Sequence, residues 1–207
     1  KKLWEGFQSK RAPVVSVLRL EGMIGGGGRF QRGLSLDAIS RDIDAAFASN
    51  RVRAVALVIN SPGGAPVQAE LIRRRLVDLS TEKDIPLVAF CEDVAASGGY
   101  WLAASADEIY ANAASVIGSI GVVSAGFGFD RAIERLGVER RVYTAGTNKM
   151  ILDPFQPEKE ADVVRLKSLQ AEIHEQFITH VTDRRGGKLT GPHDDLFSGA
   201  FWTGAAA

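Results

Sequence analysis

Residues 86–106 read PLVAFCEDVAASGGYWLAASA and give the clearest indication of the fold class. The apolar run Pro86–Cys91 has the length and composition of a strand that is buried on both faces. A short connection over Glu92–Ala96 follows, and the small residues of Ser97–Ala106 predict a helix. This strand, turn and helix order is typical of an α/β protein with crossover connections between its strands.

The same order occurs just upstream. Ala54–Ile59 is a second apolar run of strand length, and it leads into the turn Asn60-Ser-Pro-Gly-Gly64. The helix expected after this turn places three apolar residues on its inner face: Ile72, Leu76 and Leu79. Two strand–turn–helix units therefore stand in sequence.

Periodicity predicts the remaining elements. Ser35 is expected to cap a helix whose buried face carries Leu36, Ile39, Ile43 and Phe47. The four glycines of Gly25–Gly28 predict a mobile surface loop, because they match no phosphate-binding pattern. Further strands are expected at Val14–Leu20, Ile109–Ala111, Gly121–Ala125 and Val138–Thr144. A helix is expected over Phe129–Leu136, and a long one is expected to carry an apolar stripe of Leu166, Leu169, Ile173 and Phe177. A last helix is expected to start within Phe201–Ala207.

Composition indicates an ordinary globular protein. The chain has 207 residues, of which 45% are hydrophobic and 24% charged, so one domain over residues 1–207 is expected. Lys plus Arg and Asp plus Glu each number 25, which gives no electrostatic reason to expect nucleic acid as a partner. No apolar run approaches the length of a membrane-spanning helix, so we expect a soluble piece whose membrane association would need a further segment. We also expect the domain to be truncated at both ends, with its C-terminal helix incomplete.

Ser97 is the candidate nucleophile. It is expected at the start of a short helix, directly after a buried strand, where unpaired backbone N–H groups and a partial positive charge can stabilise an oxyanion. Gly98 and Gly99 allow a substrate backbone to come close. The glycine pair Gly63-Gly64 can aim a second N–H at the same point. A serine before glycines is also a common helix cap, and the glycine pair is also an ordinary turn.

The base that would activate this serine is less obvious. His174, His180 and His193 all lie late in the chain without an evident acidic orienter, and Cys91 is expected to be a small buried hydrophobe. Lys149 stands in a turn flanked by apolar residues. A lysine desolvated there would lose its proton more easily and could act as the base, although the pattern alone favours an ordinary surface lysine.

Four motifs together identify a resemblance: Asn60-Ser-Pro-Gly-Gly64, Ser97-Gly-Gly-Tyr100, Ser115-Val-Ile-Gly-Ser119-Ile-Gly-Val122, and Lys149 before Asp153-Pro-Phe155. On these motifs the chain resembles the signal-peptide peptidase A family of serine-lysine peptidases. The 52 positions from Ser97 to Lys149 are similar to the spacing in single-domain members.

The resemblance implies a ClpP/crotonase-like spiral of repeated strand-strand-helix units. It also implies that Ser97 is the nucleophile, Lys149 the general base, and Ser119 the hydroxyl that orients the lysine. Gly64 and Gly98 would supply the oxyanion N–H groups, and an extended substrate would bind beside Gly63 and Gly64. No metal or organic cofactor is expected.

The resemblance further implies apolar or unfolded peptide substrates such as signal-peptide remnants, assembly as a homo-oligomer in which neighbouring protomers complete each site, and a place at the bacterial inner membrane. Two alternatives remain open. One is a crotonase-like acyl-thioester enzyme that uses the same two N–H donors without a serine nucleophile. The other is an inactive scaffold of the same fold that binds peptides.

Overall fold

The computed structural model describes residues 12–26 and 33–207. Its strands are β1 (Val14–Glu21), β2 (Val52–Ser61), β3 (Leu87–Ala96), β4 (Glu108–Ala111), β5 (Val116–Gly118) and β6 (Phe201–Thr203). Its helices are α1 (Leu36–Ala46), α2 (Pro66–Lys83), α3 (Gly98–Ala104), α4 (Asp130–Arg135), α5 (Glu160–Arg185), a short 3₁₀ turn (Gly186–Lys188) and α6 (His193–Leu196). The α/β class expected from the sequence is confirmed.

The chain divides into two compact units. The first contains residues 1–121 and 177–207, and the second contains residues 122–176. The expectation of a single peptidase domain over residues 1–207 stays a prediction.

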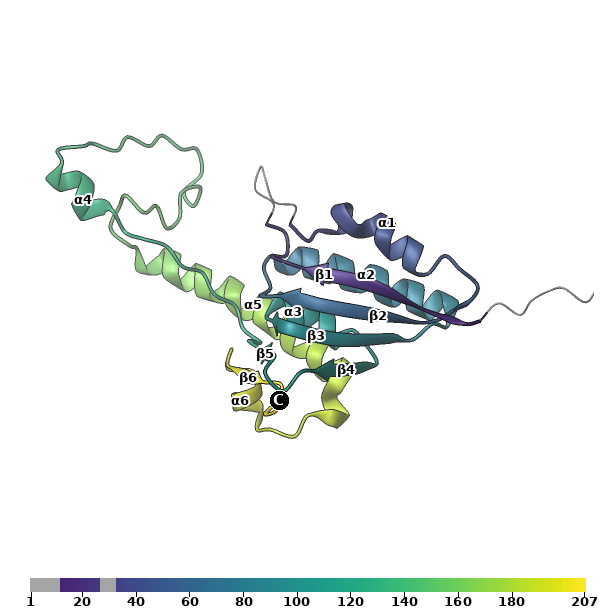
Figure 1. Cartoon of the computed structure of the whole chain (residues 1–207). Coiled ribbons are helices and arrows are strands. Elements are labelled where there is room, and N and C mark those ends of the chain that lie inside the picture. Colours follow the sequence, from purple (N-terminus) through teal and green to yellow (C-terminus); the bar gives the residue numbers. More distant parts are fainter. Residues whose placement is uncertain (1–11, 27–32) are drawn as a thin grey trace, which may run out of the picture. The chain divides into compact units, whose positions relative to one another are not determined.

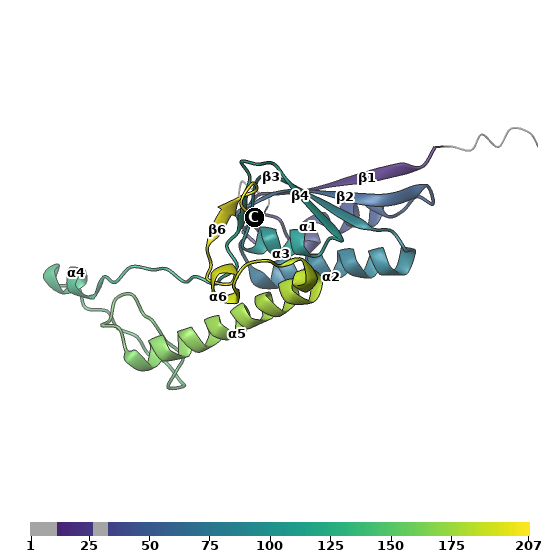
Figure 2. The ribbon, with the colours of Figure 1, turned by 90° about the horizontal axis from the view of Figure 1, so that it is seen from below.

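One sheet organises the first unit, with strand order β1-β2-β3-β5-β6 (Figure 1). The strands β1, β2, β3 and β5 are parallel neighbours, whereas β6 runs antiparallel to β5. Besides β2, strand β3 has two further partners: Val88–Cys91 pairs with β4, and Val94–Ala96 pairs with β5. Helices α1, α2 and α3 lie on one face of this sheet, as Figure 2 shows.

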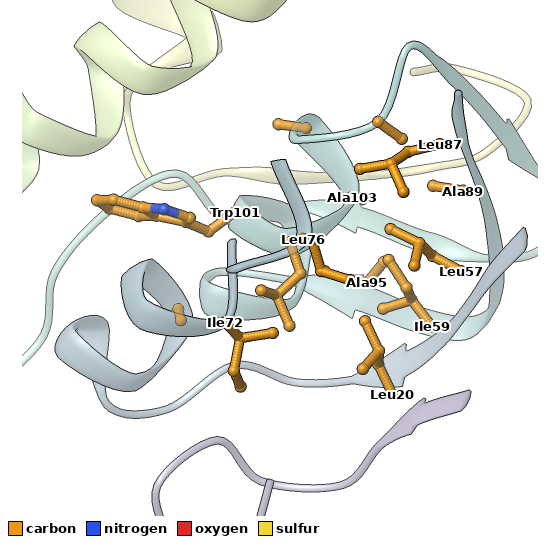
Figure 3. Packing of buried hydrophobic residues seen from close by; sticks show 14 of the residues in the cluster. Leu20, Leu57, Ile59, Ile72, Leu76, Leu87, Ala89, Ala95, Trp101 and Ala103 are labelled. Carbon is orange, nitrogen blue, oxygen red and sulfur yellow. The ribbon is translucent and has the colours of Figure 1, made fainter. Parts of the chain in front are cut away.

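The core lies between that face of the sheet and the helices. Leu57, Ile59 and Leu87 project from the strands toward Ile72 and Leu76 of α2 (Figure 3), and all five side chains are buried. Helix α1 begins as expected, because the Ser35 hydroxyl accepts a hydrogen bond from the Ala38 N–H, and Ile43 and Phe47 are buried. The inner faces predicted for α1 and α2 are confirmed.

Strand β3 is longer than predicted. The sequence indicated a connection over Glu92–Ala96, but this segment continues the strand to Ala96. The polar pair Glu92-Asp93 was misleading, because tertiary partners replace the apolar pattern here. The Asn60 side chain donates to the Asp93 carboxylate and accepts from the Val94 N–H, and β5 then pairs with the last residues.

Three other predictions of secondary structure are wrong. Gly121–Ala125 and Val138–Thr144 form no strands, because β-branched residues form strands only where a neighbouring strand pairs with them. Phe201–Thr203 is strand β6 rather than the start of a helix, since it pairs with Val116–Gly118. The apolar stripe of α5 is also incomplete: Phe177 is buried, but Leu169 is 44% exposed.

The glycine-rich loop is described only in part. The Gly25 N–H donates to the Leu34 carbonyl, and Ile24 forms bridges with Leu34 and Gly64. Gly27 and Gly28, on which the prediction of a mobile loop also rests, lie outside the described residues.

Candidate active site

Ser97 occupies the sharp turn between β3 and α3. Its backbone has φ 52° and ψ −123°, a conformation that costs a residue with a Cβ about 1–3 kcal/mol. Its N–H donates to the Gly118 carbonyl (2.8 Å), and its own carbonyl accepts from the Trp101 N–H (2.9 Å). The side chain makes no capping hydrogen bond with α3. The helix-cap interpretation of Ser97 is therefore wrong, and a strained turn presents a hydroxyl that is free of the helix.

The Gly63-Gly64 turn packs directly against Ser97. A Cβ added to Gly63 would lie 2.7 Å from the Gly98 nitrogen and 2.8 Å from the Ser97 Cβ. A Cβ added to Gly98 would lie 3.4 Å from the Gly64 nitrogen. Gly63 is required here, because a side chain at this position would separate the turn from the serine. The structure thus brings Gly63, Gly64, Ser97 and Gly98 together, as the sequence predicted.

Two backbone donors remain unpaired in this arrangement. Gly98 is the first residue of α3, so its N–H has no partner within the helix. Neither the Gly98 N–H nor the Gly64 N–H donates a hydrogen bond to any part of residues 12–26 and 33–207. Both are therefore available to an external oxygen, and the first turn of α3 adds its partial positive charge. Two unpaired N–H groups on adjoining turns can together stabilise negative charge on one oxygen.

Ser119 lies at the same end of the neighbouring strand. Ala96 of β3 pairs with Gly118 of β5. Ser97 and Ser119 are the next residues after this pair, one on each strand. Ser119 also has a positive φ, of 55°, and its N–H donates to the Ala200 carbonyl (2.7 Å). The structure therefore places the chain at Ser119 beside that at Ser97. Ser119 is half-buried, and its hydroxyl makes no hydrogen bond within residues 12–26 and 33–207.

Ser61 is a site residue that the sequence reasoning missed. It is fully buried, and its hydroxyl donates to the Gly22 carbonyl (2.6 Å) and accepts from the Gly63 N–H (3.2 Å). These bonds hold the glycine turn in its position. The signal was a small polar residue at the end of an apolar strand, where a hydroxyl needs internal partners.

Lys149 belongs to the second unit. It is exposed, so the apolar residues that flank it in the sequence do not desolvate it in the single chain, and its role as the base stays a prediction. The segment around it is nevertheless held in place. Arg140 bonds to the Asp153 carboxylate (2.8 Å), whose side chain is only 5% exposed, and the Phe155 N–H donates to the same carboxylate. The hydrogen bond from Arg140 is the main cause that lowers the pKa of Asp153.

Two other candidate nucleophiles or bases are buried in structural roles. Burial raises the pKa of the Cys91 thiol to about 11, so this residue is a thiol at neutral pH, as expected for a small buried hydrophobe. Burial also lowers the pKa of His180, whose Nε2 bonds to the Trp101 carbonyl (2.9 Å).

The described residues hold no cluster of three or more His, Cys, Asp or Glu side chains suited to a metal ion. Within the same residues, no helix is both long enough and apolar enough to cross a membrane.

Comparisons with known proteins match the chain to a family model and to several longer relatives. The family model described as peptidase family S49 matches residues 80–207. A Na(+)/H(+) antiporter NhaA of Brucella abortus is 56% identical over 93% of this chain and 26% of its own length. Protease 4 of Haemophilus influenzae is 30% identical over 93% of this chain and 31% of its own length. A putative signal peptide peptidase SppA of Enterococcus faecium is 30% identical over 65% and 39%. The chain thus spans well under half the length of these relatives.

Proposed function

Because the chain belongs to peptidase family S49, we propose that it carries the catalytic centre of a serine protease with Ser97 as nucleophile and Lys149 as general base. The α/β fold agrees with the ClpP/crotonase-like architecture of that family. One observation carries the proposal: a strained Ser97 stands beside two unpaired N–H groups, from Gly64 and Gly98.

The reaction follows from these groups. The neutral Lys149 amine takes the Ser97 proton while the Ser97 oxygen bonds to the peptide carbonyl carbon, and the N–H groups of Gly64 and Gly98 receive the oxyanion. Collapse breaks the carbon–nitrogen bond, and Lys149 returns its proton to the leaving amine. Water then gives a proton to Lys149 and attacks the acyl ester, and Ser97 leaves with that proton. The Ser119 hydroxyl orients the lysine.

We assign an extended, apolar peptide as the substrate, such as a signal-peptide remnant or an unfolded segment at the bacterial inner membrane. The extended chain lies by strand addition beside Gly63 and the exposed Gly64, so that its scissile carbonyl reaches the unpaired Gly64 N–H. The names Protease 4 and signal peptide peptidase SppA among the relatives support a peptide substrate.

Assembly into a homo-oligomer belongs to the same proposal. The second unit exposes large apolar side chains that a folded protein normally covers, each between 76% and 90% exposed: Val123, Phe127, Leu136 and Tyr143. A second copy of the chain would cover them and would desolvate Lys149, which is exposed in the single chain. Neighbouring protomers would in this way complete each active site.

Hydrolysis of a fluorogenic apolar peptide tests the dyad. We expect both Ser97→Ala and Lys149→Ala to lower kcat at least about 1,000-fold, because each removes one half of an activated nucleophile. Lys167→Ala, which removes an exposed lysine of α5, should retain wild-type activity. A serine-reactive phosphonate should label Ser97 in the wild type. Hydrolysis that survives Ser97→Ala would refute the proposal and favour the thioester chemistry.

A further inference from the structure

Trp101 lies one helical turn after Ser97 and is held at three points. Its backbone N–H donates to the Ser97 carbonyl (2.9 Å), its indole Nε1–H donates to the Glu70 carboxylate (3.1 Å), and its carbonyl bonds to His180 Nε2 (2.9 Å). The residue is only 5% exposed, and Figure 3 shows it at the edge of the core beside α2. A buried indole with all its polar groups bonded has a fixed position.

Glu70, the partner of this indole, is itself fixed. Arg73 donates two hydrogen bonds to the Glu70 carboxylate, of 2.6 and 2.7 Å, in the paired geometry that guanidinium and carboxylate prefer. Partial burial opposes the charge, but the bonds from Arg73 and Trp101 lower the pKa of Glu70 below its ordinary value. Glu70 is therefore a carboxylate at neutral pH and a strong acceptor for the indole.

The Trp101–Glu70 bond joins the two helices that follow the two oxyanion donors. Gly98 opens α3, which carries Trp101, and Gly64 lies just before α2, which carries Glu70. The two donors come from separate turns, so their separation depends on how α2 and α3 are held together. Trp101 and Glu70 each lie within two helical turns of one donor, so the hydrogen bond between them limits the separation of the two N–H groups more directly than contacts at the far ends of α2 and α3.

We propose that the Trp101–Glu70 hydrogen bond is a positioning element of the active site, which sets the separation of the Gly64 and Gly98 N–H groups. This inference rests on the proposed function, because it assumes that these groups receive an oxyanion. Trp101 and Glu70 are positioning residues: they act through α3 and α2 and need not touch the substrate.

Packing and hydrogen bonding can be separated at Trp101. Its ring packs on Phe177, with centroids 4.7 Å apart, and on His180, at 5.3 Å. Trp101→Phe retains an aromatic ring for these contacts but removes the donor to Glu70. Glu70→Gln retains an acceptor oxygen for the indole, whereas Glu70→Leu removes it.

Steady-state hydrolysis of the fluorogenic apolar peptide is the first test. Trp101→Phe and Glu70→Leu should each lower kcat about 10-fold or more with KM changed less than about 2-fold, because a misplaced oxyanion donor weakens transition-state binding and not substrate binding. Glu70→Gln should retain most of the wild-type kcat, because its amide oxygen can still accept the hydrogen bond from the indole. The double variant Trp101→Phe/Glu70→Leu should be no slower than either single variant, since both remove the same bond. Glu82→Gln, an exposed carboxylate on the same helix, is the matched control.

A second measurement separates positioning from loss of structure. A peptide aldehyde with the substrate's residues forms a tetrahedral adduct on Ser97, so its affinity should fall in proportion to kcat/KM in Trp101→Phe. The dissociation constant of the uncleaved peptide, measured in the Ser97→Ala background, should stay within about 2-fold. Wild-type kcat or unchanged aldehyde affinity in Trp101→Phe would overturn this inference. Activity in Ser97→Ala alone would instead overturn the proposed function.

Discussion

At the scale of single residues, Gly63 shows how closely the site is packed. Its φ is 102°, and a Cβ at this position would approach both the Gly98 nitrogen and the Ser97 Cβ within 2.8 Å. Backbone atoms cannot move aside as a flexible side chain can, so the turn and Ser97 would have to separate. Gly63 is thus needed for the approach of the two turns and not only for its conformation.

We therefore expect Gly63→Ala to abolish peptide hydrolysis and to lower the free energy of unfolding by about 2–4 kcal/mol, from backbone strain and the clash together. Gly137→Ala is the matched control, because Gly137 also has a positive φ (64°) but has no atom within 4 Å of an added Cβ. It should cost about 1–2 kcal/mol and leave kcat unchanged. Activity measurements and urea unfolding of both variants decide this, and an active Gly63→Ala enzyme would contradict the packing argument.

At the scale of elements, the last turns of α5 dock on α3 through His180. The imidazole packs on Trp101, and burial lowers its pKa. The positive charges of Arg73 on α2 and Arg184 on α5 also lower this pKa, whereas the negative charge of Glu70 on α2 raises it. On acidification the unfolded chain takes up the histidine proton first, near pH 6.5, whereas the folded chain takes it up only at lower pH. This contact therefore stabilises the fold above the ordinary histidine pKa and loses stability as the pH falls below it.

The expected result is a wild-type free energy of unfolding that falls between pH 7.5 and 5.5, with His180 contributing at most about 1.4 kcal/mol per pH unit. His180→Gln should be less stable at pH 7.5 but should lose less on acidification. His193→Gln removes an exposed histidine and should retain the wild-type slope. Urea unfolding at both pH values measures this, and equal slopes in His180→Gln and the wild type would exclude His180 as the source.

At the scale of the whole molecule, the proposed assembly would cover the exposed apolar residues of the second unit and desolvate Lys149. A charge placed among apolar side chains that become buried on assembly is strongly unfavourable. Phe127 is 80% exposed in the single chain, so a substitution there should have little effect on the fold itself.

Phe127→Asp should therefore shift the protein to a lower mass in sedimentation and lower peptide hydrolysis at least about 10-fold, with the thermal unfolding midpoint nearly unchanged. Phe127→Tyr retains the ring and should behave as the wild type in both measurements. An assembly that survives Phe127→Asp with full activity would remove this residue from the proposed interface.

The amino-acid sequence alone determined the α/β class, the buried strands β2 and β3, the inner faces of α1 and α2, and the glycine pairs that follow these two strands. These features are local: apolar runs, helical spacing and glycine pairs follow from the properties of neighbouring residues. Only the tertiary structure decided that β3 continues through Glu92-Asp93, that Trp202 lies in a strand, and that Trp101 reaches Glu70 on another helix. Each of these depends on a partner distant in the sequence, because strand pairing and side-chain hydrogen bonds are satisfied across the fold and leave no local pattern.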